Sequence, residues 1–204
     1  MIHLPLGLTW RRRSTDGFDF TQHMRALCSD VAARLPEYRH IDMDRVAIRY
    51  CQARKSVRHG LQATLTPLRF AGGSLSIKRG RRNWTIQRLY NTCGTEVLYI
   101  LSFYLPRFLD MSYQDKLNTV FHELWHIGPK FDGDMRRHPG RCYAHTHSQR
   151  QYDAEMASLA ACWLALRPPR EVHEFLRHNF AELRRRHGVV VGTRLPEPKL
   201  IPLD

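Results

Sequence analysis

TVFHELWHI, residues 119–127, is the stretch that decides the fold. His122 and His126 are four positions apart, so on an α-helix both side chains lie on one face, with Glu123 beside them. The other residues of the stretch are uncharged, as expected of a helix that packs in a core and is open on one polar face. Two imidazoles on one face can bind one metal ion, and a carboxylate between them can take a proton from water. The stretch predicts a helical HExxH site with two histidine ligands and a glutamate base.

Signals on both sides of the motif mark the ends of this helix. Ser112 is a preferred capping residue, and Asp115 places an acid at the third helical position, which is a variant of the capping box. Gly128 and Pro129 follow the motif and stop the helix.

The rest of the chain reads as short strands and further helices. Helical spacing of apolar residues predicts helices over about 18–35, over about 149–166 with Met156 buried, and, with a basic face, over about 171–186. Apolar and β-branched runs between glycines predict strands of one small sheet at 45–50, 61–68, 83–89 and 96–104. The expected fold is α+β, a small mixed sheet packed on the HExxH helix with additional helices before and after it. We expect one domain over residues 1–190 and a C-terminal tail over 191–204.

A third metal ligand must lie elsewhere in the sequence, because catalytic zinc takes three protein ligands and keeps one position open to water. His138 follows His126 after eleven residues, and Gly133 within this segment allows the chain to turn back over the helix. The alternative third ligands are Glu155, His145 and His147. Their other roles would be hydrogen bonds to the ligand histidines and, for the glutamate, a charge at a helix N-terminus. Tyr143 is a candidate for stabilising an oxyanion.

The net charge of +13 is spread unevenly, because no acid occurs between Arg45 and Thr95. Aromatic residues are interleaved with the basic ones in this window, a composition that suits phosphate contacts and base stacking. The candidate polyanion-binding residues are Arg54, Lys55, Arg58, Lys78, Arg79, Arg81 and Arg82. The partner would be DNA, RNA or an acidic protein, and the alternative is a solvated basic surface in an arginine-rich chain.

The sequence predicts a cytoplasmic protein that does not enter a membrane. Its longest apolar stretch, residues 97–105, is about half the length of a membrane-spanning helix. The N-terminus is apolar first and basic second, the reverse of a secretory signal. The five cysteines are scattered and form no CxxC pair, so neither a disulfide scaffold nor a zinc ribbon is indicated.

Residues 99–161 resemble zincin-type metallopeptidases, and more closely a metallopeptidase family of prokaryotes and phages. The features that carry this resemblance are the strand EVLYILSFYL, the segment 111–116, the core TVFHELWHI and the loop FDGDMRRHPGR. In zincins the strand before the active helix is often the edge along which an extended peptide lies, which implies this role for residues 96–104.

HExxH followed at this distance by His-Pro-Gly is also similar to SprT-like and Wss1-like proteases, which cut proteins crosslinked to DNA. This resemblance implies that His122, His126 and His138 bind one zinc ion per chain and that Glu123 is the base. Two features differ: the chain has no C-terminal cysteine zinc ribbon, and Pro139 stands where a glycine usually follows the third histidine. The metzincin pattern is excluded, because no histidine occurs six residues after His126.

The function predicted from these features is hydrolysis of peptide bonds by an intracellular zinc-dependent endopeptidase with a polypeptide substrate, recruited to nucleic acid by its basic surface. Another zinc-dependent hydrolysis is the nearest alternative. The alternative from a different class is a zinc-stabilised module that binds nucleic acid or protein without catalysis, with all four zinc ligands supplied by protein, for example by His145 or His147.

Overall fold

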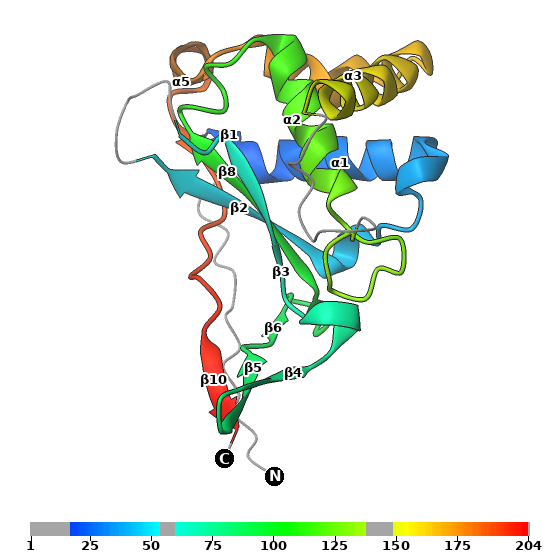
Figure 1. Cartoon of the computed structure of the whole chain (residues 1–204). Helices are drawn as coiled ribbons and strands as arrows, with labels where there is room; N and C mark the ends of the chain where they lie inside the picture. The colour runs from blue at the N-terminus through cyan, green and yellow to red at the C-terminus, as the bar shows by residue number, and fades with distance from the viewer. Residues whose placement is uncertain (1–16, 54–59, 138–148, 204) are drawn as a thin grey trace.

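A three-stranded mixed sheet forms the centre of the fold. The computed structural model describes residues 17–53, 60–137 and 149–203 (Figure 1). In the sheet, β8 (Tyr99–Leu105) lies between β2 (Val46–Gln52) and β3 (Ala63–Pro67), parallel to β2 and antiparallel to β3. The predicted α+β class is therefore confirmed.

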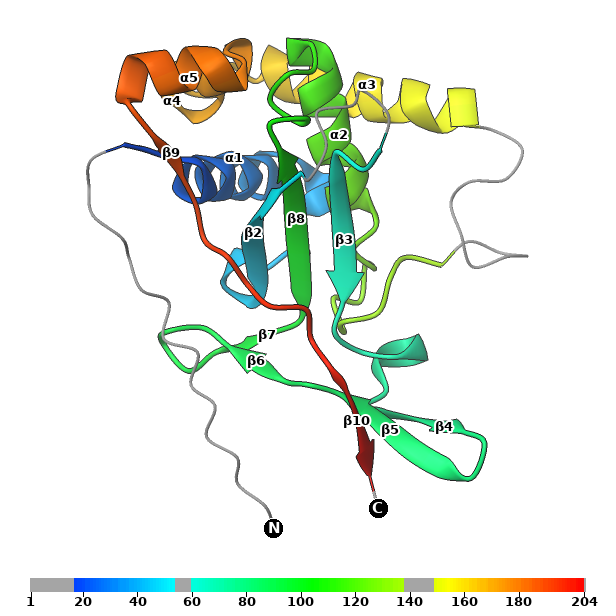
Figure 2. The ribbon, with the colours of Figure 1, turned by 90° about the vertical axis from the view of Figure 1, so that its left-hand side faces the viewer.

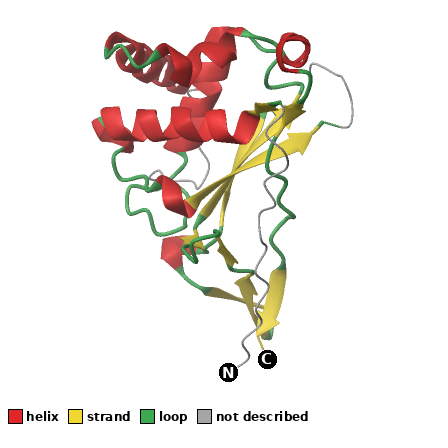
Figure 3. Cartoon of the chain, turned by 180° about the vertical axis from the view of Figure 1, so that it is seen from behind, coloured by secondary structure: helices red, strands yellow, loops and turns green. Residues whose placement is uncertain are grey.

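Helices cover one face of this sheet (Figures 1 and 3). They are α1 (Phe20–Arg34), α2 (Tyr113–Trp125) and α3 (Gln149–Ala165). Alternate residues of β8, among them Leu101 and Phe103, are fully buried against these helices. Met156 of α3 is buried in the same cluster, as predicted. The other face of β8, including Ile100, is buried as well, which explains why its sequence is apolar almost throughout.

The C-terminal segment crosses the second face of the sheet (Figure 2). The backbone N–H of Tyr50 donates to the carbonyl of Thr193 at 2.8 Å. Arg49, buried on this face, donates to Ser102 Oγ at 3.0 Å and forms an ion pair with Glu197 at 2.6 Å. The segment then ends in β10 (Leu200–Leu203), which pairs with β5 (Arg82–Ile86). The tail expected over 191–204 therefore contains a strand, which its residues do not reveal because they lack polar alternation and include a proline.

The expectation that all predicted strands belong to one sheet is wrong. β5 pairs with β4 (Ser76–Arg79) and β10 in a separate sheet. β6 (Leu89–Tyr90) pairs with β7 (Glu96–Val97), and β1 (Phe18–Asp19) pairs with β9 (Val190–Val191). Strand order depends on tertiary contacts, which runs of residue types do not encode.

The prediction of a single basic helix over 171–186 is also wrong. The structure divides it into α4 (Arg170–His173), a 3₁₀ turn η4 (Glu174–Arg177) and α5 (Phe180–His187). Asn179 and Glu182 form a capping box, which starts a new helix at this point.

Further 3₁₀ turns are η1 (Pro36–Tyr38), η2 (Met43–Arg45) and η3 (Ala71–Gly73). Across the described ranges, none of the helices combines the length and apolar character needed to cross a membrane.

Candidate active site

The helix that carries the HExxH motif has the predicted ends. The backbone N–H of Asp115 donates to Ser112 Oγ at 3.1 Å, so Ser112 is the N-cap of α2. The helix ends at Trp125, and His126 is the C-cap. The N–H of His126 donates to the carbonyl of His122 at 3.3 Å, which preserves the helical spacing of the two histidines.

The two histidine rings converge on one point. Their Nε2 atoms are 3.0 Å apart, and the rings meet at an interplanar angle of 82°. Two nitrogens that bind one tetrahedral zinc at bond lengths of about 2.1 Å are about 3.4 Å apart. The same donor atoms therefore fit a zinc ion after a small outward shift. A hydrogen bond between the rings is the other arrangement that suits this distance, and it requires a proton on one Nε2.

Glu123 lies between α2 and the sheet. Its side chain is largely buried, with the residue 8% exposed, and its carboxylate accepts a hydrogen bond from the backbone of Leu65 in β3. Burial raises the pKa of Glu123 to about 7, although this hydrogen bond acts in the opposite direction. A carboxyl group with a pKa close to neutrality can both take and release a proton under ordinary conditions.

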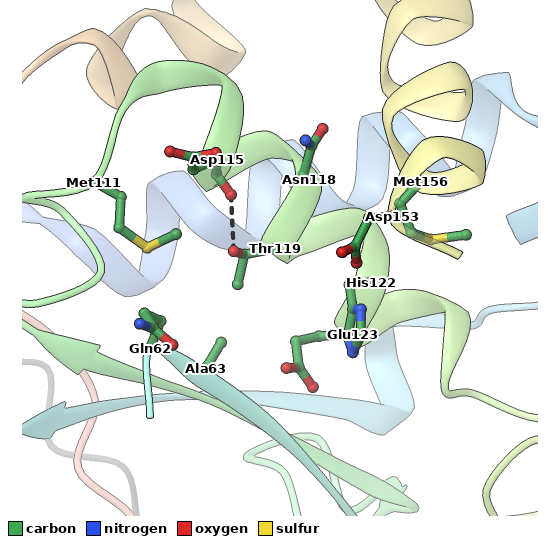
Figure 4. Close-up of a pocket in the computed structure, with 10 residues that line it drawn as sticks. All are labelled: Gln62, Ala63, Met111, Asp115, Asn118, Thr119, His122, Glu123, Asp153 and Met156. Atoms are coloured by element: carbon green, nitrogen blue, oxygen red, sulfur yellow. Dashed lines mark hydrogen bonds between the residues drawn. The ribbon is translucent and has the colours of Figure 1, made fainter. Parts of the chain in front are cut away.

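Glu123 and His122 line a pocket of about 380 Å³ between α2, α3 and β3 (Figure 4). Asn118 and Thr119 also reach it from α2, and Ala63 forms part of the opposite wall. The histidine–glutamate pair is thus placed beside a space that a substrate can enter.

Asp153 of α3 also lines this pocket, although it is not among the site residues predicted from the sequence. Its spacing from Met156, which is predicted to be buried, places Asp153 on the inner face of α3, but this spacing does not show that α3 packs beside α2. Glu155, the acidic alternative ligand, is exposed and is not among the pocket-lining residues. Two helical positions correspond to a rotation of about 200°, so Glu155 lies away from the face of Asp153.

The remaining predicted site residues of this region lie outside the described ranges. They are His138, Tyr143, His145 and His147. Within the described ranges, no group of three or more His, Cys, Asp or Glu side chains could hold a metal ion. The third ligand therefore stays a prediction.

The loop that leads to His138 returns to the end of α2. The backbone N–H of Arg136 donates to the carbonyl of His126 at 2.7 Å, and Arg136 Nε donates to the carbonyl of Trp125 at 2.7 Å. The N–H of Gly133 donates to Tyr99 Oη at 2.9 Å, which holds the loop against β8. The loop thus returns to the C-terminal end of α2, and its turn back over the helix toward His138 stays a prediction.

The edge strand beside the site is β3, and the expectation that residues 96–104 form this edge is wrong. β8 lies in the middle of its sheet. Tyr104 donates its N–H to the carbonyl of Gln62, and this pairing turns the backbone groups of Ala63 and Leu65 away from β8. The nearly continuous apolar run of residues 97–105 is the signal that marks a central strand.

The candidate polyanion-binding residues fall into two sets. Arg54, Lys55 and Arg58 lie outside the described ranges, whereas Lys78, Arg79, Arg81 and Arg82 are exposed on β4, β5 and the turn between them. This position is distant in the fold from the HExxH site (Figure 1).

Comparison of the chain with protein-family models, characterised proteins and solved structures finds no match. The resemblance to zincins therefore rests on the residues and their spacing.

Proposed function

We propose that the protein is a zinc-dependent endopeptidase. The observation that carries this proposal is the convergence of the His122 and His126 Nε2 atoms at a pocket that His122 and Glu123 line and that the edge strand β3 bounds. Two metal ligands and the general base required for metal-assisted hydrolysis have candidates at this position.

His122 and His126 would hold the metal, with a third donor from the segment that follows Arg137. His138 suits this role because Arg136 is already hydrogen-bonded to the backbone of His126. When bound, zinc supplies a water of lowered pKa and polarises the scissile carbonyl. Asp153, which lines the same pocket, is a candidate to accept a hydrogen bond from a ligand histidine and so to fix the orientation of its ring.

Glu123 would move the proton. Its carboxylate is held by the Leu65 backbone, so it takes the proton from water without first losing side-chain freedom. It then delivers that proton to the amine of the leaving group. Because Leu65 belongs to β3, the base and the substrate-binding strand are fixed relative to each other.

The edge of β3 would bind the polypeptide. Backbone N–H and C=O groups of Ala63 point away from β8, and an extended peptide can pair with such groups as an added strand. This pairing recognises the main chain, so it fits a substrate defined by its peptide bonds. The open pocket beside Glu123 favours hydrolysis over a module in which protein fills every coordination position.

The test compares Glu123→Gln with Glu155→Gln, which removes the same charge at an exposed position outside the pocket. Each purified protein is loaded with zinc, its metal content is measured by elemental mass spectrometry, and it is incubated with a mixture of unstructured peptides. New peptide termini are then counted by mass spectrometry. We expect cleavage by the wild type and by Glu155→Gln, and a loss of several orders of magnitude in Glu123→Gln with zinc retained. Cleavage by Glu123→Gln at the wild-type rate, or none by the zinc-loaded wild type, would refute the proposal.

A further inference from the structure

A small basic sheet projects from the body of the molecule at the end opposite to α5 (Figures 1 and 2). We call it the arm, and it consists of β4, the turn at Gly80–Arg81, β5 and β10. Lys78, Arg79, Arg81 and Arg82 lie around this turn, and all four are exposed. Arg79 and Arg82 are direct cross-strand partners. Like charges in this arrangement destabilise a hairpin, so the fold gains nothing from them.

Basic residues of the same acid-free window that lie near the sheet form ion pairs with acids from outside the window. Arg45, Arg69 and Arg88 all form ion pairs with Glu96, and Arg49 forms one with Glu197. In the part of the chain that the structure describes, none of the four arm cations takes part in an ion pair. Among the described basic residues of the window, those that take part in no ion pair are thus gathered at the tip of the arm.

One face of the arm combines two of these cations, Arg79 and Arg82, with an aromatic ring. Trp84 lies opposite Ile77 of β4 and Pro202 of β10, and the Arg79–Arg82 pair lies two positions further along on the same face. Trp84 is half-exposed, and it is not among the described residues that pack against either hydrophobic cluster. The Cα atoms of Trp84 and Arg82 are separated by about 7 Å along the strand.

We propose that the arm binds single-stranded nucleic acid. Arg79, Arg81 and Arg82 would contact phosphates, and an unpaired base would stack on Trp84. An acidic polypeptide would also be attracted to the cations, but it has no flat base for the indole. A duplex keeps its bases stacked inside, so it would use the phosphate contacts alone. None of these residues lines the HExxH pocket, and the proposal is therefore independent of the peptidase activity.

The test is fluorescence anisotropy of a labelled oligodeoxythymidylate, titrated with the full-length protein at several salt concentrations. The triple variant R79Q/R81Q/R82Q is compared with R184Q/R185Q/R186Q, which removes the same charge from exposed positions of α5. We expect the arm variant to lose at least about 10-fold in affinity and to reduce the slope of log K against log salt by about 2, and the α5 variant to stay near wild type. Thermal unfolding of both variants shows that each is folded.

The contribution of stacking is measured with Trp84→Leu and Trp84→Phe. Leucine keeps an apolar side chain but removes the ring, so we expect about a 10-fold loss of affinity for the leucine variant and a much smaller loss for the phenylalanine variant. Three results would overturn the proposal: no binding by the wild type, an equal loss in the two triple variants, or equal competition by duplex DNA or polyglutamate together with no effect of Trp84→Leu.

Discussion

Lys116 is a charged residue in the core of the molecule, one and a half helical turns before His122. It is 2% exposed, and its Nζ donates to the carbonyls of Leu176 and His178, each at 2.9 Å. These bonds connect α2 to the start of α5. Burial lowers the pKa of Lys116 from 10.5 to about 8. The lowered pKa makes the stability of the fold depend on pH.

Between pH 8 and 10.5 the unfolded chain binds the Lys116 proton more tightly than the folded chain. The free energy of unfolding therefore rises with pH across this window, and the contribution is lost as the pH falls through about 8. We expect Lys116→Met to remove this rise, which is on the order of 1–3 kcal/mol. Urea unfolding of both proteins at about pH 7.5 and about pH 10 gives the difference. Other groups that titrate in this window do so in both the wild type and Lys116→Met, so their effects cancel when the two proteins are compared. An equal pH dependence of the two proteins would therefore contradict the prediction.

Gly133 holds the loop between α2 and the predicted third ligand. Its φ angle is +89°, and a Cβ at this position would lie 2.4 Å from Arg69 Cγ. Gly80 has a similar left-handed conformation, with a φ angle of +63°, but nothing lies within 4 Å of its Cβ position. We expect Gly133→Ala to lower the free energy of unfolding by about 2–4 kcal/mol and Gly80→Ala by about 1 kcal/mol. Equal losses in urea unfolding would show that the close contact with Arg69 has no cost.

At this scale the sequence predicts what depends on local geometry. His122, Glu123 and His126 lie within five residues of one helix, so their relative positions follow from helical periodicity. Asp153 reaches the same pocket only because α3 packs beside α2. No short-range pattern carries that information, and the pocket role of Asp153 appears only in the structure.

For helices and strands too, the features set by neighbouring residues are predicted from the sequence, and the features set by tertiary contacts are not. The start of α2 at Ser112 is predicted because a cap is a contact between neighbouring residues. The role of β3 as the edge strand is not predicted, because it depends on which strands pair with β8. The break between α4 and α5 is a missed local signal, since Asn179 and Glu182 have the spacing of a capping box.

The cap of α2 can be tested by substitution. Ser112→Ala removes the acceptor for the Asp115 N–H, and we expect the free energy of unfolding to fall by about 1 kcal/mol. Ser112→Thr keeps a hydroxyl group and serves as the matched control, with a smaller loss. The histidine pair lies nearly three turns away, so zinc content should not change in either variant. Denaturant unfolding measures the change in the free energy of unfolding, and elemental analysis measures the zinc content. A loss of zinc in Ser112→Ala would contradict the expectation that zinc content does not change.

For the whole molecule, the distribution of charge and the path of the chain link the two proposed sites. β3 lines the candidate active site, and the chain then runs through η3 directly into β4 of the arm (Figure 2). The sequence predicts the excess of positive charge but not its location, because Glu96 forms ion pairs with three arginines that are distant from one another in the sequence and offsets only part of their charge. A peptide bound at β3 and a nucleic acid bound at the arm would thus contact one continuous segment of the chain, which runs from β3 through η3 to β4.

Zinc binding at α2 would be measurable as stability of the entire fold. A ligand that binds only the folded state stabilises it in proportion to the logarithm of its concentration, by about 2.7 kcal/mol at 100 times its Kd. Zinc added to the metal-free protein should therefore raise the unfolding temperature measured by calorimetry. We expect His126→Ala to abolish this increase and His187→Ala, which removes an exposed histidine of α5, to retain it. If the rings of His122 and His126 only share a proton, zinc will have no effect on the wild type, and an equal increase in His126→Ala would place the metal elsewhere in the chain.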